Sequence, residues 1–450
     1  MKLIVIPLLL FLGTAPMGAG DVETPNKILP YPIHVHDMPN GLRVVTVPYE
    51  SPGIATFYII VRAGSRDETE PGKSGFAHFF EHMMFRGTEK YPKERYNEIL
   101  KSIGASANAN TSNDRTVYHM TGNAEMLEKM FELEADRFMN LKYSIQDFKV
   151  EAGAVKGEYT KNFANPYMQL YEKVRATAFT KHTYGHTTMG FFEDIVDMPN
   201  QYEYSLQFFD RFYRPEYSTI LVVGDVTPEK VNALAEKYFG SWKRGNYTTK
   251  VTPEPPQTET RYVHLQVPNF PPLVGLSFKG PAFSDKTLDM PALDVLSLLL
   301  FSEKSELFKK LVLEERKVRS LWGGAQDSRD PYLFDIQASV VDASDLQYVK
   351  DEIMKAIEKA QKEPVDPEEL KKVVSNLKYR FAMDMDSPDA IAGALSNYIW
   401  ITGDPEALNR TYANYEKVTP EDIMRVASKY LVTTGLTIST ISPDEKGGVK

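Results

Sequence analysis

The chain has 450 residues, 42% of them hydrophobic and 12% aromatic, which supports roughly two to three packed domains and excludes a disordered protein. Its formal net charge is −9 and the sequence has no basic block, which argues against nucleic acid as a general partner. It contains no cysteine, so disulfides and thiolate metal sites are excluded.

Residues 1–20 have the layout of a secretory signal peptide, because one lysine precedes an apolar run and then small residues. A buried N-terminal strand is the alternative. The apolar run is too short for a membrane span, and no later segment offers eighteen uninterrupted apolar residues. Residues 1–30 contain no arginine, which argues against a mitochondrial presequence. We therefore expect an exported protein, most simply one of a bacterial periplasm.

The first half of the chain alternates predicted strands and helices. Apolar alternation predicts strands, and apolar residues at helical spacing predict helices, with Ser144 as the N-cap of one of them. The predicted strands are 41–50, 54–65, 111–120 and 218–223, and the predicted helices are 74–85, 96–103, 124–139, 144–162 and 200–213.

A polar, proline-containing segment at 243–260 has no helical or strand period, which marks it as the domain boundary. We predict an N-terminal domain at 30–245, a linker at 246–260 and a C-terminal domain at 261–446. Both parts end in a helix that leads into a short apolar strand, STILVV in the first and LTISTI in the second. This shared order predicts an internal duplication of one α/β unit.

Residues 78–82 read HFFEH, which places two histidines and a glutamate within five residues. On a helix, His78 and His82 lie one turn apart on the same face, where two imidazoles can bind one metal ion. Glu81 lies beside that face and can hold a metal-bound water as a general base. The order inverts the commoner His-Glu-x-x-His motif. The alternative is a half-exposed helix with solvated polar side chains.

A catalytic zinc ion needs a third protein ligand and an open position for water. The segment VEAGAVKGEYTKN offers Glu151 and Glu158, which lie two helical turns apart on one face. A pair of carboxylates on an otherwise apolar face is expected to face something positive. Ordinary exposed glutamates are the alternative.

A second histidine pair, His182 and His186, has the same spacing as the first. Tyr184 and Gly185 between them argue against a helix, and no carboxylate is placed to act as a base. We therefore do not expect these histidines to form a metal site.

Six stretches, in this order and spacing, resemble the pitrilysin/insulinase family of zinc metallopeptidases, nearest to its mitochondrial-processing-peptidase-like branch, whose motif is the inverzincin type. They are GFAHFFEHMMFRGTEKYP, GASANANTSNDRTVYHM, VEAGAVKGEYTKN, NPYMQLYEKV, HTYGHTTMG and RFYRPEYSTILVVGDVTPE, and they cover most of residues 35–240.

The resemblance implies an α+β fold of two related domains, each a mainly antiparallel sheet packed with helices, which face each other as a clamshell. It implies a zinc endopeptidase with one Zn²⁺ per chain. In the family, the third ligand is the second glutamate of such a helical pair, and Glu158 lies 76 residues after His82. The implied ligands are His78, His82 and Glu158, with Glu81 as the general base and Glu151 as a supporting residue.

The segment SANANTSNDRTVY of this chain resembles the family's edge strand, on which an extended peptide substrate lies. Strand addition gives affinity through the backbone with little sequence choice. The implied substrate-binding residues are Asn108, Ala109 and Thr111. An ordinary strand and turn is the alternative.

In active single-chain or homodimeric family members, the second domain supplies an arginine and a tyrosine seven residues apart that contact the substrate. Aligned through SELF, these positions fall on Val312 and Arg319, and residues 260–450 contain no such pair. We therefore hypothesise a zinc-bearing subunit of a heterodimer whose related partner carries the Arg/Tyr pair. A self-sufficient homodimer or monomer, and a non-catalytic scaffold subunit of the same fold, are the alternatives.

Overall fold

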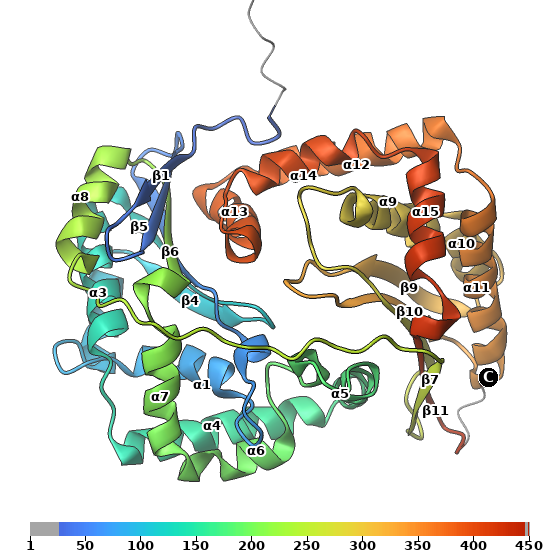
Figure 1. The fold of residues 1–450 in the computed structure, drawn as a ribbon, viewed down its shortest axis with the longest axis horizontal. Helices are drawn as coiled ribbons and strands as arrows, with labels where there is room; N and C mark the ends of the chain where they lie inside the picture. Colours follow the sequence, from blue (N-terminus) through green and yellow to red (C-terminus); the bar gives the residue numbers. More distant parts are fainter. Residues whose placement is uncertain (1–26, 446–448, 450) are drawn as a thin grey trace, which may run out of the picture.

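The structure is a computed structural model that describes residues 27–445 and 449 (Figure 1). The predicted signal peptide at 1–20 lies outside the described residues. No helix in the described part of the chain is both long enough and apolar enough to cross a membrane.

Two sheets form the centres of the two halves of the molecule. The first has the order β1-β2-β6-β3-β5-β4 and the second β7-β11-β8-β10-β9. The strands of the first sheet are β1 (His34–Asp37), β2 (Arg43–Pro48), β3 (Ile54–Val61), β4 (Ser106–Thr111), β5 (Thr116–Asn123) and β6 (Ser218–Gly224). Those of the second sheet are β7 (Arg261–Gln266), β8 (Leu273–Lys279), β9 (Val318–Ala325), β10 (Leu333–Val340) and β11 (Leu436–Ser442).

Helices surround both sheets. In the first half they are α1 (Phe76–Met83), α2 (Lys93–Ser102), α3 (Leu127–Asn140), α4 (Ile145–Phe163), α5 (Pro166–Ala178), α6 (Phe192–Asp197), α7 (Tyr202–Phe212) and α8 (Pro228–Phe239). In the second half they are α9 (Asp289–Phe301), α10 (Glu306–Phe308), α11 (Leu346–Lys362), α12 (Pro367–Asp384), α13 (Pro388–Thr402), α14 (Ala407–Tyr415) and α15 (Pro420–Tyr430). A wide turn at Lys309–Glu314 extends α10.

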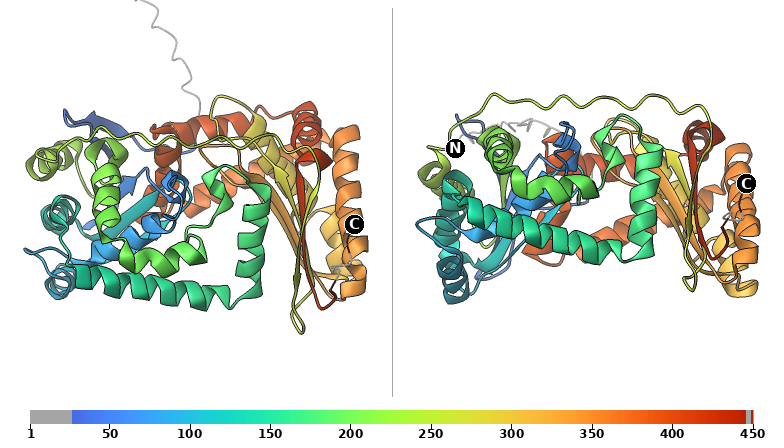
Figure 2. Two further views of the ribbon diagram at one scale, coloured as in Figure 1. Left: turned by 60° about the horizontal axis from the view of Figure 1, so that its bottom comes forward. Right: turned by 90° about the horizontal axis from the view of Figure 1, so that it is seen from below.

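The two sheets repeat one topology, which is the duplication that the order of elements in the sequence predicts. The first sheet begins with an additional strand, β1, which pairs antiparallel with β2. From β2 and from β7 onward the two sheets match: the first pair is parallel, β2 with β6 and β7 with β11, and the pairs that follow are antiparallel. The helix-to-strand units α7–β6 and α15–β11 occupy matching places. Residues 243–260, which have no helix or strand, run along the outside of the molecule from one half to the other (Figure 2).

The prediction of a single strand at 111–120 is wrong. The chain forms β4 and β5 with a tight turn at 112–115 between them, closed by a hydrogen bond from Ser112 N to Arg115 O at 2.9 Å. The strand pattern continues on both sides of the turn, and the prediction treated the short polar interruption as part of one strand. The turn is specified by Asn113 and Asp114, which are turn-forming residues and are both buried here.

Each half contributes one helix to the other half's sheet. Helix α13 packs against β3 and β6 of the first sheet, where Ile391, Leu395 and Ile399 join one buried cluster with strand residues. Helix α5 packs against β7 and β11 of the second sheet through Leu170 and Val174 (Figure 1). Each is the third helix after the equivalent strand, β5 or β10. The exchange interlocks the two halves.

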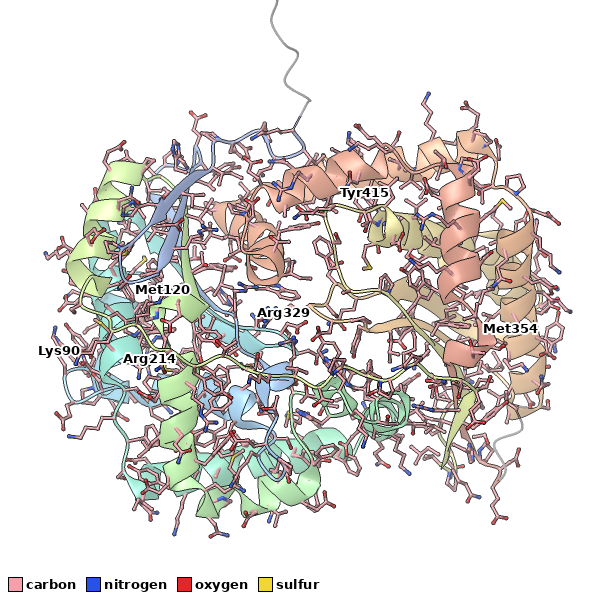
Figure 3. All side chains as sticks on the ribbon, in the orientation of Figure 1. Lys90, Met120, Arg214, Arg329, Met354 and Tyr415 are labelled. Atoms are coloured by element: carbon pink, nitrogen blue, oxygen red, sulfur yellow. The ribbon has the colours of Figure 1, made fainter. Side chains whose placement is uncertain are left out.

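The tips of two hairpins meet between the halves, where Figure 3 labels Arg329. Arg175 of α5 is fully buried there. Its Nη2 donates to Asn113 Oδ1 at 3.2 Å and its Nε to the Tyr184 carbonyl at 3.0 Å, while Nη1 donates to the Tyr332 hydroxyl. Asn113 is at the β4–β5 tip and Tyr332 at the β9–β10 tip. One guanidinium therefore ties both hairpin tips to α5.

We expect Arg175→Met to destabilise the whole chain, because it leaves buried polar groups at both hairpin tips without a partner. The expected loss is about 3 kcal/mol of unfolding free energy. The measurement is the thermal unfolding midpoint by calorimetry. The control is Arg380→Met at an exposed site on α12, for which we expect a change within about 0.5 kcal/mol. Equal midpoints for the two variants would contradict the role of Arg175.

Candidate metal centre

Helix α1, which carries the HFFEH motif, is fixed at its N-terminus by a buried carboxylate. Glu68 is 4% exposed, and its two oxygens accept hydrogen bonds from Gly75 N at 2.8 Å and Ala77 N at 2.7 Å. Gly75 has φ 91°, and a Cβ there would lie 2.4 Å from Ile195 Cδ1. Burial raises the pKa of Glu68 well above its usual value, while these two hydrogen bonds oppose the rise. The start of α1 is therefore set by both backbone geometry and capping.

The opposite faces of α1 have different environments. Phe76, Phe79, Phe80 and Met83 are buried in the aromatic core of the first half. This burial fixes the rotation of the helix about its axis, because the apolar residues recur at helical spacing. His78 and His82 consequently point toward α4, which packs on α1, while Glu81 contacts the end of β4.

The structure brings His78, His82 and Glu158 together. His82 Nε2 lies 3.2 Å from Glu158 Oε2, and His78 Nε2 lies 3.7 Å from the same oxygen. One ligand atom from each residue lies within 4.8 Å of the other two, so the group can hold a metal ion. Ligand atoms about 2 Å from a tetrahedral zinc are about 3.3 Å apart, so the donor set and its spacing fit this ion.

The pKa values favour a metal-binding state of the buried histidine. Burial, with the nearby His82 ring, lowers the pKa of His78, which keeps this imidazole neutral. His82 is more open, and the hydrogen bond to Glu151 raises its pKa. The side chains of His82 and Glu158 are 27% and 37% exposed, so one side of the group is open to solvent.

A second layer of side chains holds the His82 ring. Glu151 Oε1 lies 3.0 Å from His82 Nδ1, and Arg86 Nε donates to the other oxygen of Glu151. Burial opposes ionisation of Glu151, but the hydrogen bonds from His82 and Arg86 outweigh it and lower the pKa. A supporting role for Glu151 is what the family resemblance implies, whereas Arg86 was not predicted. Its position one helical turn after His82 is the one sequence signal that could have indicated it.

Glu81 faces the same space without joining the group of possible metal ligands. Its Oε2 accepts a hydrogen bond from the Thr111 hydroxyl at 2.6 Å. Thr111 was expected to contact a substrate directly, and here its side chain contacts the expected base. This contact joins the end of β4 to α1.

Strand β4 is the outer strand of the first sheet on the side of α1. Hydrogen-bonded pairs alternate along an antiparallel ladder, so the pair Ser112–Arg115 places the backbone groups of Ala107, Ala109 and Thr111 outward. The outward N–H of Ala109 donates to the side-chain oxygen of its neighbour Asn108 at 2.9 Å. The edge is thus free of strand partners near the metal group.

The second histidine pair lies apart from this group. His182 Nε2 lies 2.9 Å from Asp330 Oδ2, and His186 Nδ1 lies 2.9 Å from the Thr187 carbonyl. Both side chains are buried. Among residues 27–445, His78, His82 and Glu158 form a group whose ligand atoms are close enough to hold a metal ion, and neither His182 nor His186 belongs to such a group.

Val312 and Arg319, the positions aligned with the family's arginine and tyrosine, both lie in the second half. Val312 lies half-buried in the wide turn after α10, and Arg319 lies exposed on β9.

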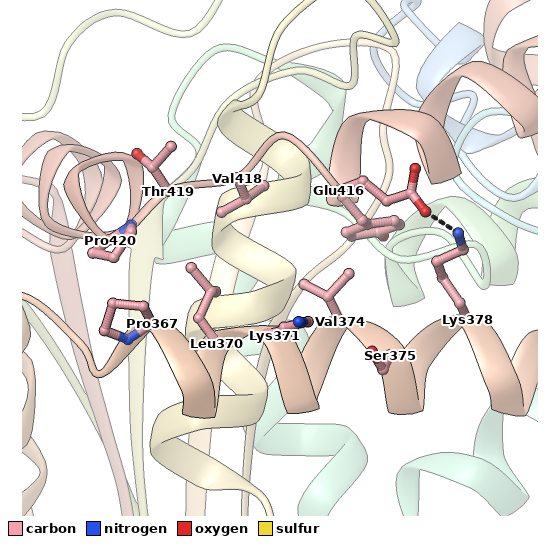
Figure 4. A pocket seen from close by; sticks show the side chains of 11 residues that line it. Pro367, Leu370, Lys371, Val374, Ser375, Lys378, Glu416, Val418, Thr419 and Pro420 are labelled. Atoms are coloured by element: carbon pink, nitrogen blue, oxygen red, sulfur yellow. Dashed lines mark hydrogen bonds and ion pairs between the residues drawn. The ribbon is translucent and has the colours of Figure 1, made fainter. Parts of the chain in front are cut away.

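A hollow of about 690 Å³ lies between α12 and the α14–α15 connection (Figure 4). Its lining includes Leu370, Val374 and Val418 and none of the metal-group residues, so it is a separate feature of the second half.

Comparisons with known proteins agree with this architecture. A family model described as "Insulinase (Peptidase family M16)" matches residues 43–190, and one described as "Peptidase M16 inactive domain" matches residues 201–377. The zinc protease PqqE of Helicobacter pylori is 31% identical over 417 residues, which are 90% of this chain and 91% of that protein.

A probable mitochondrial-processing peptidase subunit beta of Arabidopsis thaliana is 26% identical over 93% of this chain and 80% of that protein. The crystal structure of a protease from Helicobacter pylori superposes with a TM-score of 0.85 at 29% identity, covering 92% of this chain and 100% of the other. The folds therefore agree over nearly the whole length, and the chain belongs to the M16 (insulinase) family of peptidases.

Proposed function

We propose that this chain is a zinc-dependent endopeptidase that cleaves unfolded peptides. The observation that carries the proposal is the convergence of His78, His82 and Glu158, with Glu81 beside them on an open side. Two imidazoles and one carboxylate that leave an open position form the donor set of a catalytic rather than a structural zinc site. A structural site would give Glu81 no role.

In this proposal His78, His82 and Glu158 hold one zinc ion, which supplies Lewis acidity toward water and toward the peptide carbonyl. Glu81 takes a proton from the attacking water and later gives it to the leaving amine. The Thr111 hydroxyl holds one oxygen of Glu81 and leaves the other free for the proton transfer.

An extended peptide is the substrate that the edge of β4 supports. The outward backbone groups of Ala109 can pair with a peptide once the Asn108 side chain turns away from the Ala109 N–H. Strand addition requires an unpaired, extended backbone, which an unfolded peptide offers along its length and a folded protein offers only at the edges of its sheets. Asn108 and Ala109 therefore contact substrate in this proposal, and Thr111 acts mainly through Glu81.

We further infer an exported chain that works with a related partner. Residues 1–20 support export, with a bacterial periplasm as the simplest destination. Val312 and Arg319 stand where an arginine and a tyrosine would contact substrate, which supports a partner that supplies this pair. The relative from Arabidopsis thaliana is itself named as a subunit.

The metal and the chemistry can be separated by mutation. We expect Glu81→Gln to keep one zinc per chain and to lose peptide hydrolysis, because only the proton acceptor is removed. His78→Ala and Glu158→Ala each remove a ligand and should lose both. The measurements are metal content of the purified chain and hydrolysis of a quenched fluorescent peptide. Full activity of Glu81→Gln, or no stoichiometric zinc in the unmodified chain, would refute the proposal.

We expect Arg86 and Glu151 to affect zinc affinity more than they affect the stability of the fold. We expect Arg86→Met and Glu151→Gln each to weaken zinc binding by about 10–100-fold, because the His82 ring loses its orientation. Competition with a chelator measures this affinity. Arg95→Met on the exposed face of α2 is a matched control and should leave it unchanged. Equal zinc affinity in all three variants would contradict the supporting role.

The partner hypothesis predicts weak activity for the zinc-loaded chain alone. We expect its kcat/KM to be about a hundredfold below that of the same chain combined with a related subunit that carries the Arg/Tyr pair, because an unclamped peptide is poorly positioned. Both values come from one quenched peptide at saturating zinc. High activity of the isolated chain would instead favour a self-sufficient monomer or homodimer.

A further inference from the structure

The hairpin beside the metal group carries a guanidinium with one unpaired donor atom. Arg115 is the last residue of the turn before β5, and its Nη1 donates to the Asn110 carbonyl at 3.0 Å and to the Asn110 side chain. Its Nε is buried and has no hydrogen-bond partner in the described structure. Burial lowers the pKa of Arg115, but a guanidinium stays charged at neutral pH. The charge of this guanidinium is therefore only partly satisfied by hydrogen bonds within the chain, and a nearby anion would be attracted to it.

Arg115 and the metal group lie on opposite faces of β4. Residues opposite one another in an antiparallel pair point to the same side. Asn110 is opposite Val117, which packs under α13, so Arg115 and Asn110 lie on the α13 face. Thr111 is opposite Thr116 and donates to Glu81 on the α1 face. A peptide paired with β4 would therefore pass between the metal group and Arg115.

The two faces would contact alternate side chains of such a peptide. In an extended strand, successive side chains point to opposite sides and recur on one side about every 6.6 Å. One set would point toward the α1 face and the metal group. The other set would point toward the α13 face, where Asn108 and Asn110 are exposed and Arg115 lies beside them.

The charges on the α13 face change along the strand. Arg115 is attracted by Glu81, which lies across the strand, and by Asp114, whose carboxylate already accepts from the Tyr184 hydroxyl at 2.8 Å. Farther along, Asp389 of α13 accepts from the Tyr58 hydroxyl at 3.0 Å and lies 3.9 Å from His119. The face is therefore positive beside Asn110 and negative toward the other end of β4.

We propose that Arg115 determines substrate specificity by binding an acidic side chain at the peptide position that lies beside Asn110 on the α13 face. The inference rests on the proposed function, because it takes the edge of β4 as the peptide site. It gives the chain a cation for its substrate in the same half that carries the metal group. The preference for an acidic side chain is limited to this one peptide position, since Asp389 repels acidic side chains farther along the strand.

The test uses one quenched peptide in which each position in turn carries Glu, Gln or Lys. We expect one position at which the unmodified, zinc-loaded chain prefers Glu to Lys by about tenfold in kcat/KM, a size reasonable for a partly desolvated charge pair. Arg115→Glu should invert the preference at that position, and Arg115→Gln should abolish it. Arg380→Glu makes the same charge change at an exposed site of α12 and should leave the preference intact.

Binding to the zinc-loaded Glu81→Gln chain is measured in parallel by fluorescence anisotropy, with and without Arg115→Glu. If no peptide is cleaved but binding shows the same charge preference and its inversion, the hydrolase proposal fails and the role of Arg115 stands. Equal binding of Glu and Lys peptides at every position, or a preference that survives Arg115→Glu in a chain with unchanged zinc content and thermal midpoint, would overturn the inference.

Discussion

The buried guanidinium of Arg175 is the contact on which the arrangement of the two halves depends. It joins the tip of the β4–β5 hairpin to the tip of the β9–β10 hairpin and to the chain after α5. Thr111 lies at the end of β4, next to the β4–β5 tip, and donates to Glu81. The position of this hairpin tip therefore also affects the position of Glu81, the expected base. A contact outside the candidate metal group thus helps to define the geometry of the proposed site.

Contacts on the protein side of the metal group hold its side chains in position. Core packing sets the rotation of α1, Glu68 sets its start, and Glu151 with Arg86 sets the orientation of His82. These contacts restrict the side chains of the proposed metal site. Glu158 comes from a separate helix and is the most exposed of the three proposed ligands, which suits the proposed role of admitting a peptide.

Sequence reasoning predicted the parts of the site that depend on helical spacing. His78, Glu81 and His82 share one helix, and Glu151 and Glu158 share another, so their faces could be read from the chain, while the pairing of the two helices came from the family resemblance. Arg86 and the Thr111–Glu81 contact were missed because they depend on how separate elements pack. The turn within 111–120 was missed because Asn113 and Asp114 interrupt a pattern that continues on both sides. The exchange of α5 and α13 could not be predicted from the sequence, since an apolar helix face does not indicate which of the two sheets it packs against.

The reciprocal placement of α5 and α13 has a consequence for the origin of the chain. A half-length protein with this topology would leave one face of its sheet without a helix. A second copy would cover that face with its own third helix and would receive the same cover in return. The full chain therefore has the geometry of a symmetric domain-swapped dimer joined into one polypeptide, in which one half carries the candidate metal group.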